Sequence, residues 1–128
     1  MKKAIAGALA TATIITACGQ SDEWDSDFQR DQAFRKFYCQ KLEDESSGIA
    51  GSLIAMAPSL YSDPGDRAVL IKNAQMMSKG VINPSCDLGS PDYDPIIVGA
   101  WEKLAEQRYG EEFTPSMARE AGIDIENP

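Results

Sequence analysis

Residues 94–110 read DPIIVGAWEKLAEQRYG, and this stretch decides the fold class. Asp94 can accept a backbone N–H bond as an N-cap, while Pro95 loses no hydrogen bond at the first helical position. Gly110 ends the pattern. Apolar side chains recur between these signals at helical spacing, and the inward-facing ones are Ile97, Trp101, Leu104 and Ala105. The stretch therefore predicts a helix over 95–109, although Ile-Ile-Val alone would suit a strand.

The same capping device opens two further helices. Asp63-Pro64 and Thr114-Pro115 each place a capping side chain before a proline. The predicted helices, with the glycines that end them, are 64–79 before Gly80 and 115–121 before Gly122. On the first of these, the predicted inward face is Leu70, Ile71, Ala74, Met77 and Val81. The region after Gly122 reads as a short C-terminal tail.

Two more helices are predicted upstream. Residues 25–45 are predicted to form a helix, because apolar side chains at helical spacing fall within one arc of its surface, while Phe37 lies off that arc. The arc begins just before the helix and consists of Trp24, Phe28, Phe34, Tyr38, Cys39 and Leu42. Residues 48–57 are nearly uncharged and predict a short buried helix, whose small residues would let a neighbour approach closely: Gly48, Gly51, Ser52 and Ala55. No strand signal competes, so the fold class is all-α, a compact single domain of four to five helices.

The N-terminus has the layout of an export signal. Lys2 and Lys3 precede an uncharged apolar run of about 13 residues, which is too short to span a bilayer. Ile15-Thr16-Ala17-Cys18 then resembles the lipobox of bacterial lipoproteins. That resemblance implies that residues 1–17 are removed and that Cys18 carries the lipid, with 18–24 as a tether and 25–128 as the helical domain. A plain secretory signal is the alternative.

The resemblance also implies a cellular location. Gly19 follows Cys18, whereas enteric lipoproteins kept in the inner membrane usually carry Asp at that position. The expected location is therefore the bacterial cell envelope, lipid-anchored, most simply in the outer membrane facing the periplasm. Two or more acyl chains give stable anchoring where one gives only marginal binding.

Composition excludes several classes of function. The chain has no His, which removes Ser-His-Asp triads and His-ligated zinc. Its formal net charge is −8, and removal of Lys2 and Lys3 with the signal leaves about −10. This charge argues against a nucleic-acid partner and fits a basic protein partner. No cofactor motif is present.

The cysteine count is three, and the lipid site accounts for the odd one. Export would place Cys39 and Cys86 in an oxidising compartment, where pairing is expected. The closed loop of about 48 residues would stabilise the domain by roughly 4 kcal/mol in the chain-entropy model. A thiol-redox pair is the alternative, but the spacing is not C-x-x-C.

Two chemical readings compete weakly with a binding function. Glu45-Ser46 and the Gly-rich segment that ends at Pro58 resemble lytic transglycosylases, which would make Glu45 a general acid on peptidoglycan. In that family the two motifs are well separated, whereas here they nearly abut. Three neighbouring carboxylates also suggest a calcium site, but their order along the chain is not that of an EF-hand loop: Asp87, Asp92 and Asp94.

The layout of the mature part is similar to that of small helical immunity proteins of periplasmic toxins, which are exported, all-α and disulfide-stapled. We therefore expect a non-enzymatic, lipid-anchored binding protein for a toxin, a phage or conjugation component, or an envelope assembly. Phe37 and Tyr93 are the candidate interface anchors, because aromatic side chains dominate interface energy. A purely structural envelope lipoprotein and a Glu45 enzyme are the alternatives.

Overall fold

The structure, a computed structural model, describes residues 22–126 and is all-α over that range. Its helices are α1 (Asp27–Asp44), α2 (Ser46–Leu60), α3 (Pro64–Ser78), α4 (Pro95–Tyr109) and α5 (Pro115–Glu120). The only β-type pairing in this part of the chain is an isolated bridge between Ser85 and Tyr93. The predicted all-α class with four to five helices is confirmed.

The proline-initiated helices begin where the sequence predicts. Each predicted cap accepts backbone N–H bonds: Asp63 from Asp66, Asp94 from Ile96 and Ile97, and Thr114 from Met117. Gly80 and Gly122 adopt φ values of +75° and +81°, which residues with a Cβ rarely reach. Local capping chemistry thus sets both the starts and the stops of α3 and α5.

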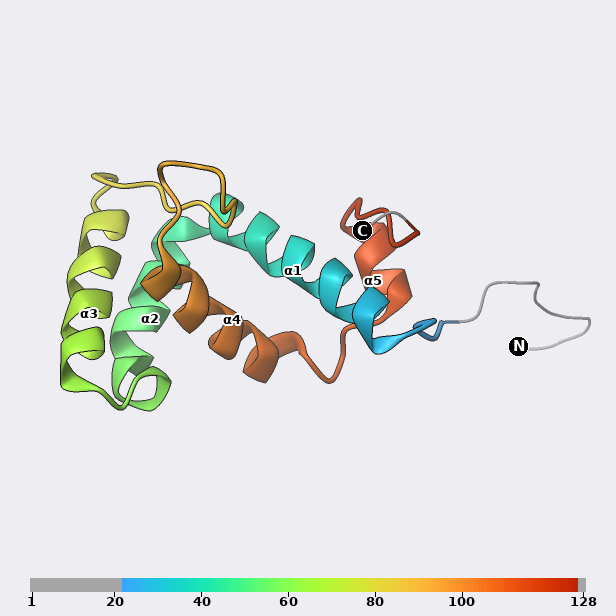
Figure 1. Cartoon of the computed structure of the whole chain (residues 1–128), viewed down its shortest axis with the longest axis horizontal. Helices are drawn as coiled ribbons and strands as arrows, with labels where there is room; N and C mark the ends of the chain where they lie inside the picture. The colour runs from blue at the N-terminus through green and yellow to red at the C-terminus, as the bar shows by residue number, and fades with distance from the viewer. Residues whose placement is uncertain (1–21, 127–128) are drawn as a thin grey trace, which may run out of the picture.

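Figure 1 shows an elongated molecule with α2 and α3 at one end and α5 at the other. Helices α1 and α4 run between these ends; α1 contacts α2, α4 and α5, while α4 contacts α1, α2 and α3. The connection from α3 to α4 returns beside the last turns of α1. The start of α1 and the residues that follow α5, up to 126, both lie at the α5 end.

Trp101 of α4 forms the centre of the core and is only 1% exposed. Its indole Nε1 donates a hydrogen bond of 2.7 Å to the backbone oxygen of Tyr38, so its buried polar group is satisfied. Toward the α5 end, the rings of Phe34 and Phe37 pack around Phe113 with centroids 5.0 and 4.9 Å away. These contacts fix α1 against α4 and the segment before α5.

The buried face of α1 differs from the predicted arc in two positions. Phe28 is 70% exposed, whereas Phe37 is only 6% exposed. Because α1 contacts α2, α4 and α5, its buried side spans about half of its circumference and includes Phe37. Phe28 lies in the first turn, beyond the edge of that side. A prediction that places all buried side chains of α1 on one arc does not account for helices that pack on both sides of that arc.

Helix α2 is longer than predicted and is turned the other way. It continues past Pro58 to Leu60. Gly48, Gly51 and Ala55 are exposed, so the prediction that they form a close-contact face is wrong. The helix instead buries its larger apolar side chains, because they remove more apolar surface from water: Ile49, Leu53 and Leu60, together with Ala50 and Ala57.

The segment before α1, which falls within the predicted tether 18–24, is packed against the domain. The Trp24 ring stacks on Phe113 with centroids 5.2 Å apart, and its Nε1 donates to the Phe113 backbone oxygen at 3.2 Å. The Asp22 carboxylate accepts bonds of 2.9 and 2.8 Å from the backbone N–H and hydroxyl of Ser116. These bonds lower the pKa of Asp22. The rest of the predicted tether, 18–21, lies outside the described residues.

The predicted C-terminal tail also packs onto the domain. Ile123 and Ile125 are buried, and the Gln29 side-chain amide donates to the Ile125 backbone oxygen at 3.0 Å. The positive φ of Gly122 turns the chain back after α5. Alternation of apolar and polar residues after a helix stop was the sequence signal for this return.

Candidate functional site

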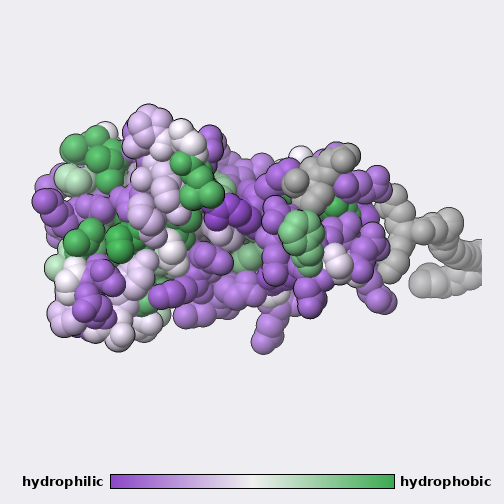
Figure 2. Space-filling model, in the orientation of Figure 1, coloured by the Kyte–Doolittle hydropathy of each residue, from purple (hydrophilic) through white to green (hydrophobic). Residues whose placement is uncertain are grey.

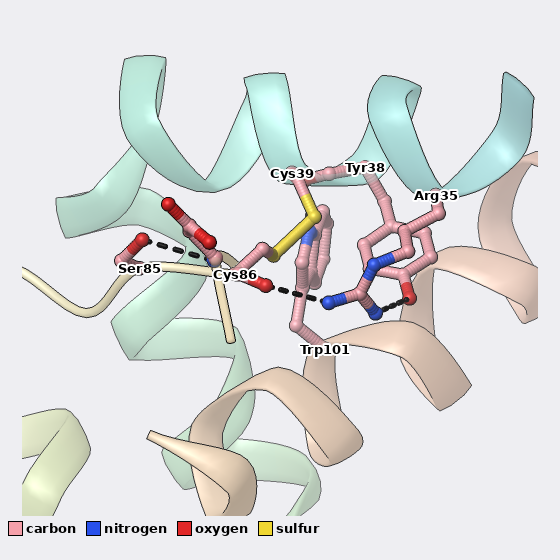
Figure 3. The surroundings of a disulfide bond; sticks show 7 residues. Arg35, Tyr38, Cys39, Ser85, Cys86 and Trp101 are labelled. Atoms are coloured by element: carbon pink, nitrogen blue, oxygen red, sulfur yellow. Dashed lines mark hydrogen bonds between the residues drawn. A yellow bond between two sulfur atoms is a disulfide. The ribbon is translucent and has the colours of Figure 1, made fainter. Parts of the chain in front are cut away.

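The connection between α3 and α4, residues 79–94, is held by a disulfide, and we call it the stapled loop. Cys39 of α1 bonds to Cys86 of the loop, with their Cα atoms 5.9 Å apart and 47 positions apart in sequence. Figure 3 shows the bond joining the middle of α1 to the loop above Trp101. The predicted pairing is confirmed, and it ties a long irregular segment to the core.

Arg35 of α1 provides a second attachment for the stapled loop. One terminal nitrogen of its guanidinium donates to the Cys86 backbone oxygen at 2.6 Å, and the other donates to the Tyr38 hydroxyl at 3.3 Å (Figure 3). Burial raises the pKa of Tyr38, and the charge of Glu102 adds to this, so the hydroxyl stays neutral. Sequence reasoning missed Arg35; its place one turn before Cys39 was the available signal.

The stapled loop is also closed on itself by hydrogen bonds. Its bonds include Ser85 N–H to Asp92 O (3.0 Å), Ser90 N–H to Asp87 O (2.9 Å), Tyr93 N–H to Ser90 O (3.2 Å) and Gly89 N–H to the Asp87 carboxylate (2.9 Å). These bonds between its two ends and within its tip make the loop compact.

Two carboxylates of the stapled loop, those of Asp94 and Asp87, accept hydrogen bonds from backbone N–H groups. Asp94 accepts from two backbone N–H groups of α4 and from the side-chain amide of Asn73 at 2.9 Å. Asp87 accepts from Gly89 as described above. Over residues 22–126, no cluster of three or more His, Cys, Asp or Glu side chains could hold a metal ion.

Two large apolar side chains of the stapled loop face solvent. Leu88 is 74% exposed and Val81 is 66% exposed. The prediction that Val81 continues the inward face of its helix is wrong, because Gly80 turns the chain away after α3. Figure 2 shows that, on the face in view, hydrophobic side chains gather over the α2–α3 end, while the α5 end is mostly hydrophilic.

Tyr93 and Phe37, the two candidate anchors, have different surroundings. Tyr93 is partly buried and lines a hollow of about 210 Å³ together with Ile82, Pro84 and Pro91. Phe37 lies in the core, where its ring meets Tyr109 edge-on at 5.5 Å, so the ring is not exposed as an interface anchor would be. Only Tyr93 remains available at the surface.

A larger hollow of about 650 Å³ lies between α1 and α4, and no sequence motif pointed to it. Positively charged, negatively charged and aromatic side chains all line it. The lining residues are Arg30, Asp31, Gln32, Phe34, Arg35, Tyr38, Gly99, Glu102, Lys103 and Glu106. Several of the charges are already paired within the molecule, as in the 3.0 Å ion pair between Arg30 and Glu106. Arg35 lines this hollow and also donates to the Cys86 backbone oxygen of the stapled loop.

Glu45 lies at the exposed junction of α1 and α2. Its carboxylate forms a 3.3 Å ion pair with Lys41. The hollows beside Tyr93 and between α1 and α4 are lined by other residues. A third hollow of about 270 Å³ is lined by its neighbours Leu42, Glu43 and Ser46, but Glu45 is not among its lining residues. Glu45 itself is exposed, whereas a carboxylic acid kept protonated for glycoside hydrolysis usually lies in an apolar pocket.

The proposed lipid site, Cys18, lies outside the described residues. Within residues 22–126 no helix combines the length and apolar character that a membrane crossing requires. No protein-family model matches the chain, and neither the curated proteins nor the solved structures contain a significant match.

Proposed function

We propose that the protein is a non-enzymatic, lipid-anchored component of the bacterial cell envelope that binds a protein partner through the stapled loop. The observation that carries the proposal is a 16-residue connection held by a disulfide and by Arg35 while Leu88 and Val81 remain exposed. Long connections without regular structure are uncommon in compact domains unless they serve a function. A loop ordered in advance also avoids an ordering penalty on binding.

The charge of the chain indicates the kind of partner. A mature net charge of about −10 follows from the formal −8 by loss of Lys2 and Lys3. The exposed carboxylates of Asp87 and Asp92 flank the tip of the stapled loop on either side of Leu88. A basic surface with an apolar recess for Leu88 would complement this arrangement, and opposite charge would speed the encounter.

Lipid attachment at Cys18 is the part of the proposal that a single variant tests. Cys18→Ala is expected to abolish incorporation of labelled acyl chains and to release the protein from membranes, because the acyl chains on Cys18 are the anchor that the proposal assigns. Flotation of envelopes on a density gradient, with acyl labelling in parallel, measures both. Gly19→Ala is the matched control and should float like the wild type. A Cys18→Ala protein that still floats would refute the lipid site.

The loop surface is tested by charge insertion at its tip. Leu88→Asp is expected to weaken binding of a stoichiometric partner by at least about 30-fold, the loss typical of an interface hot spot. The measurement is co-purification from detergent-solubilised envelopes followed by titration of the recovered partner.

Val69→Asp is the matched control, because Val69 is also an exposed apolar side chain but lies on α3, away from the stapled loop. It should leave the affinity unchanged. Equal losses in the two variants, or recovery of no stoichiometric partner by the wild type, would contradict binding through the loop.

A further inference from the structure

We propose that the α5 end of the domain rests on a zwitterionic phospholipid surface, with Phe28 as the side chain that contacts it. This inference rests on the proposed lipid attachment at Cys18. It adds an orientation to that proposal: the start of α1 faces the bilayer and the stapled loop faces away. It follows from chain length, from the exposure of one aromatic ring and from the local charge.

The distance from the proposed lipid site to the domain is short. Asp22 is held on Ser116 by two hydrogen bonds, and Trp24 is stacked on Phe113. Cys18 precedes Asp22 by only four positions. Four residues span at most about 14 Å when fully extended, since each adds at most roughly 3.6 Å. A lipid on Cys18 would therefore hold the α5 end within that distance of the headgroups.

Phe28 is the exposed aromatic side chain at this end. It is 70% exposed, and no other aromatic residue among 22–126 is a largely exposed hydrophobic side chain. Side chains on a helix lean toward its N-terminus, so Phe28, in the first turn of α1, leans toward the end where the chain arrives. An aromatic ring in that place can enter the headgroup boundary, where apolar surface is removed from water.

The charge at this end selects the kind of lipid surface. Asp25, Asp27 and Asp31 are exposed on both sides of Phe28. Carboxylates in this position would be repelled by the negative potential of anionic lipids but not by zwitterionic headgroups. The contact is therefore expected on phosphatidylcholine or phosphatidylethanolamine, and it should weaken as phosphatidylglycerol is added.

Photo-crosslinking from single positions tests the orientation. Full-length lipidated protein carrying p-benzoylphenylalanine at position 28 is reconstituted into phosphatidylcholine vesicles and irradiated. The expected result is a covalent lipid adduct, detected by mass, that decreases when phosphatidylglycerol replaces part of the phosphatidylcholine. The same reagent at position 88, another exposed apolar position, is the control and should give no lipid adduct.

The outcomes separate this inference from the proposed function. A protein that floats with the vesicles but gives no more adduct from position 28 than from position 88 overturns the orientation and leaves the lipid site standing. A protein that does not float refutes the lipid site and, with it, the orientation. Adduct formation at position 28 that is unaffected by phosphatidylglycerol contradicts the assigned preference for zwitterionic lipid.

Discussion

Replacement of Cys39 by Ser is expected to lower the free energy of unfolding by about 4 kcal/mol, the chain-entropy value for a cross-link across 47 positions. For a domain of this size the melting temperature should fall by at least about 15 °C. The loss is large because total stabilities of small domains are only about 5–15 kcal/mol. Denaturant titration under oxidising conditions, followed by circular dichroism, measures the change.

The pairing predicts a specific pattern among variants. Cys39→Ser should leave Cys86 reactive toward thiol reagents in the folded protein, and Cys86→Ser should destabilise by a similar amount. The double variant should be no less stable than either single one, since all three lack the same bond. Two thiols already reactive in the native wild type would show that the cysteines are not paired in the cell.

Replacement of Trp101 by Ala is expected to destabilise the domain by about 3–5 kcal/mol, because it leaves a large cavity in a fully buried position. The change also removes the indole N–H that satisfies the Tyr38 backbone oxygen. An orphaned buried acceptor adds to the penalty. Urea unfolding monitored by far-UV circular dichroism gives the difference in free energy.

Two matched variants make the Trp101 prediction specific. Trp101→Phe keeps much of the volume and should cost less than Trp101→Ala, while still losing the hydrogen bond. Val69→Ala removes an exposed apolar side chain and should change stability by no more than about 0.5 kcal/mol. A loss below about 1 kcal/mol for Trp101→Ala would contradict the central place of this residue in the core.

Local chemistry explains which parts of the fold were predictable. The Asp-Pro and Thr-Pro starts of α3, α4 and α5 depend only on neighbouring residues, and they were predicted to within a residue or two. The burial of Phe37 and the exposure of Phe28 depend on where α4, α5 and Phe113 lie around α1. No periodicity within α1 contains that information, so the two residues were misassigned.

The features of the candidate site also differ in whether the sequence alone could predict them. The cysteine pair followed from counting residues and from the expected compartment. The α1–α4 groove and the bond from Arg35 to the Cys86 oxygen arise only when two distant segments meet. Tyr93 was predicted as a surface aromatic, and it lines a hollow made of loop residues on both sides of Cys86.

The disulfide between Cys39 and Cys86 also has a consequence for timing. In a reducing cytosol the precursor would keep both thiols, because pairs form and persist only in oxidising compartments. The stapled loop would then lack its covalent attachment to α1, with Arg35 as its remaining link to that helix at Cys86. With the export proposed above, the loop would gain its covalent attachment outside the cytosol, and a partner made in the same cell would meet the stapled form there.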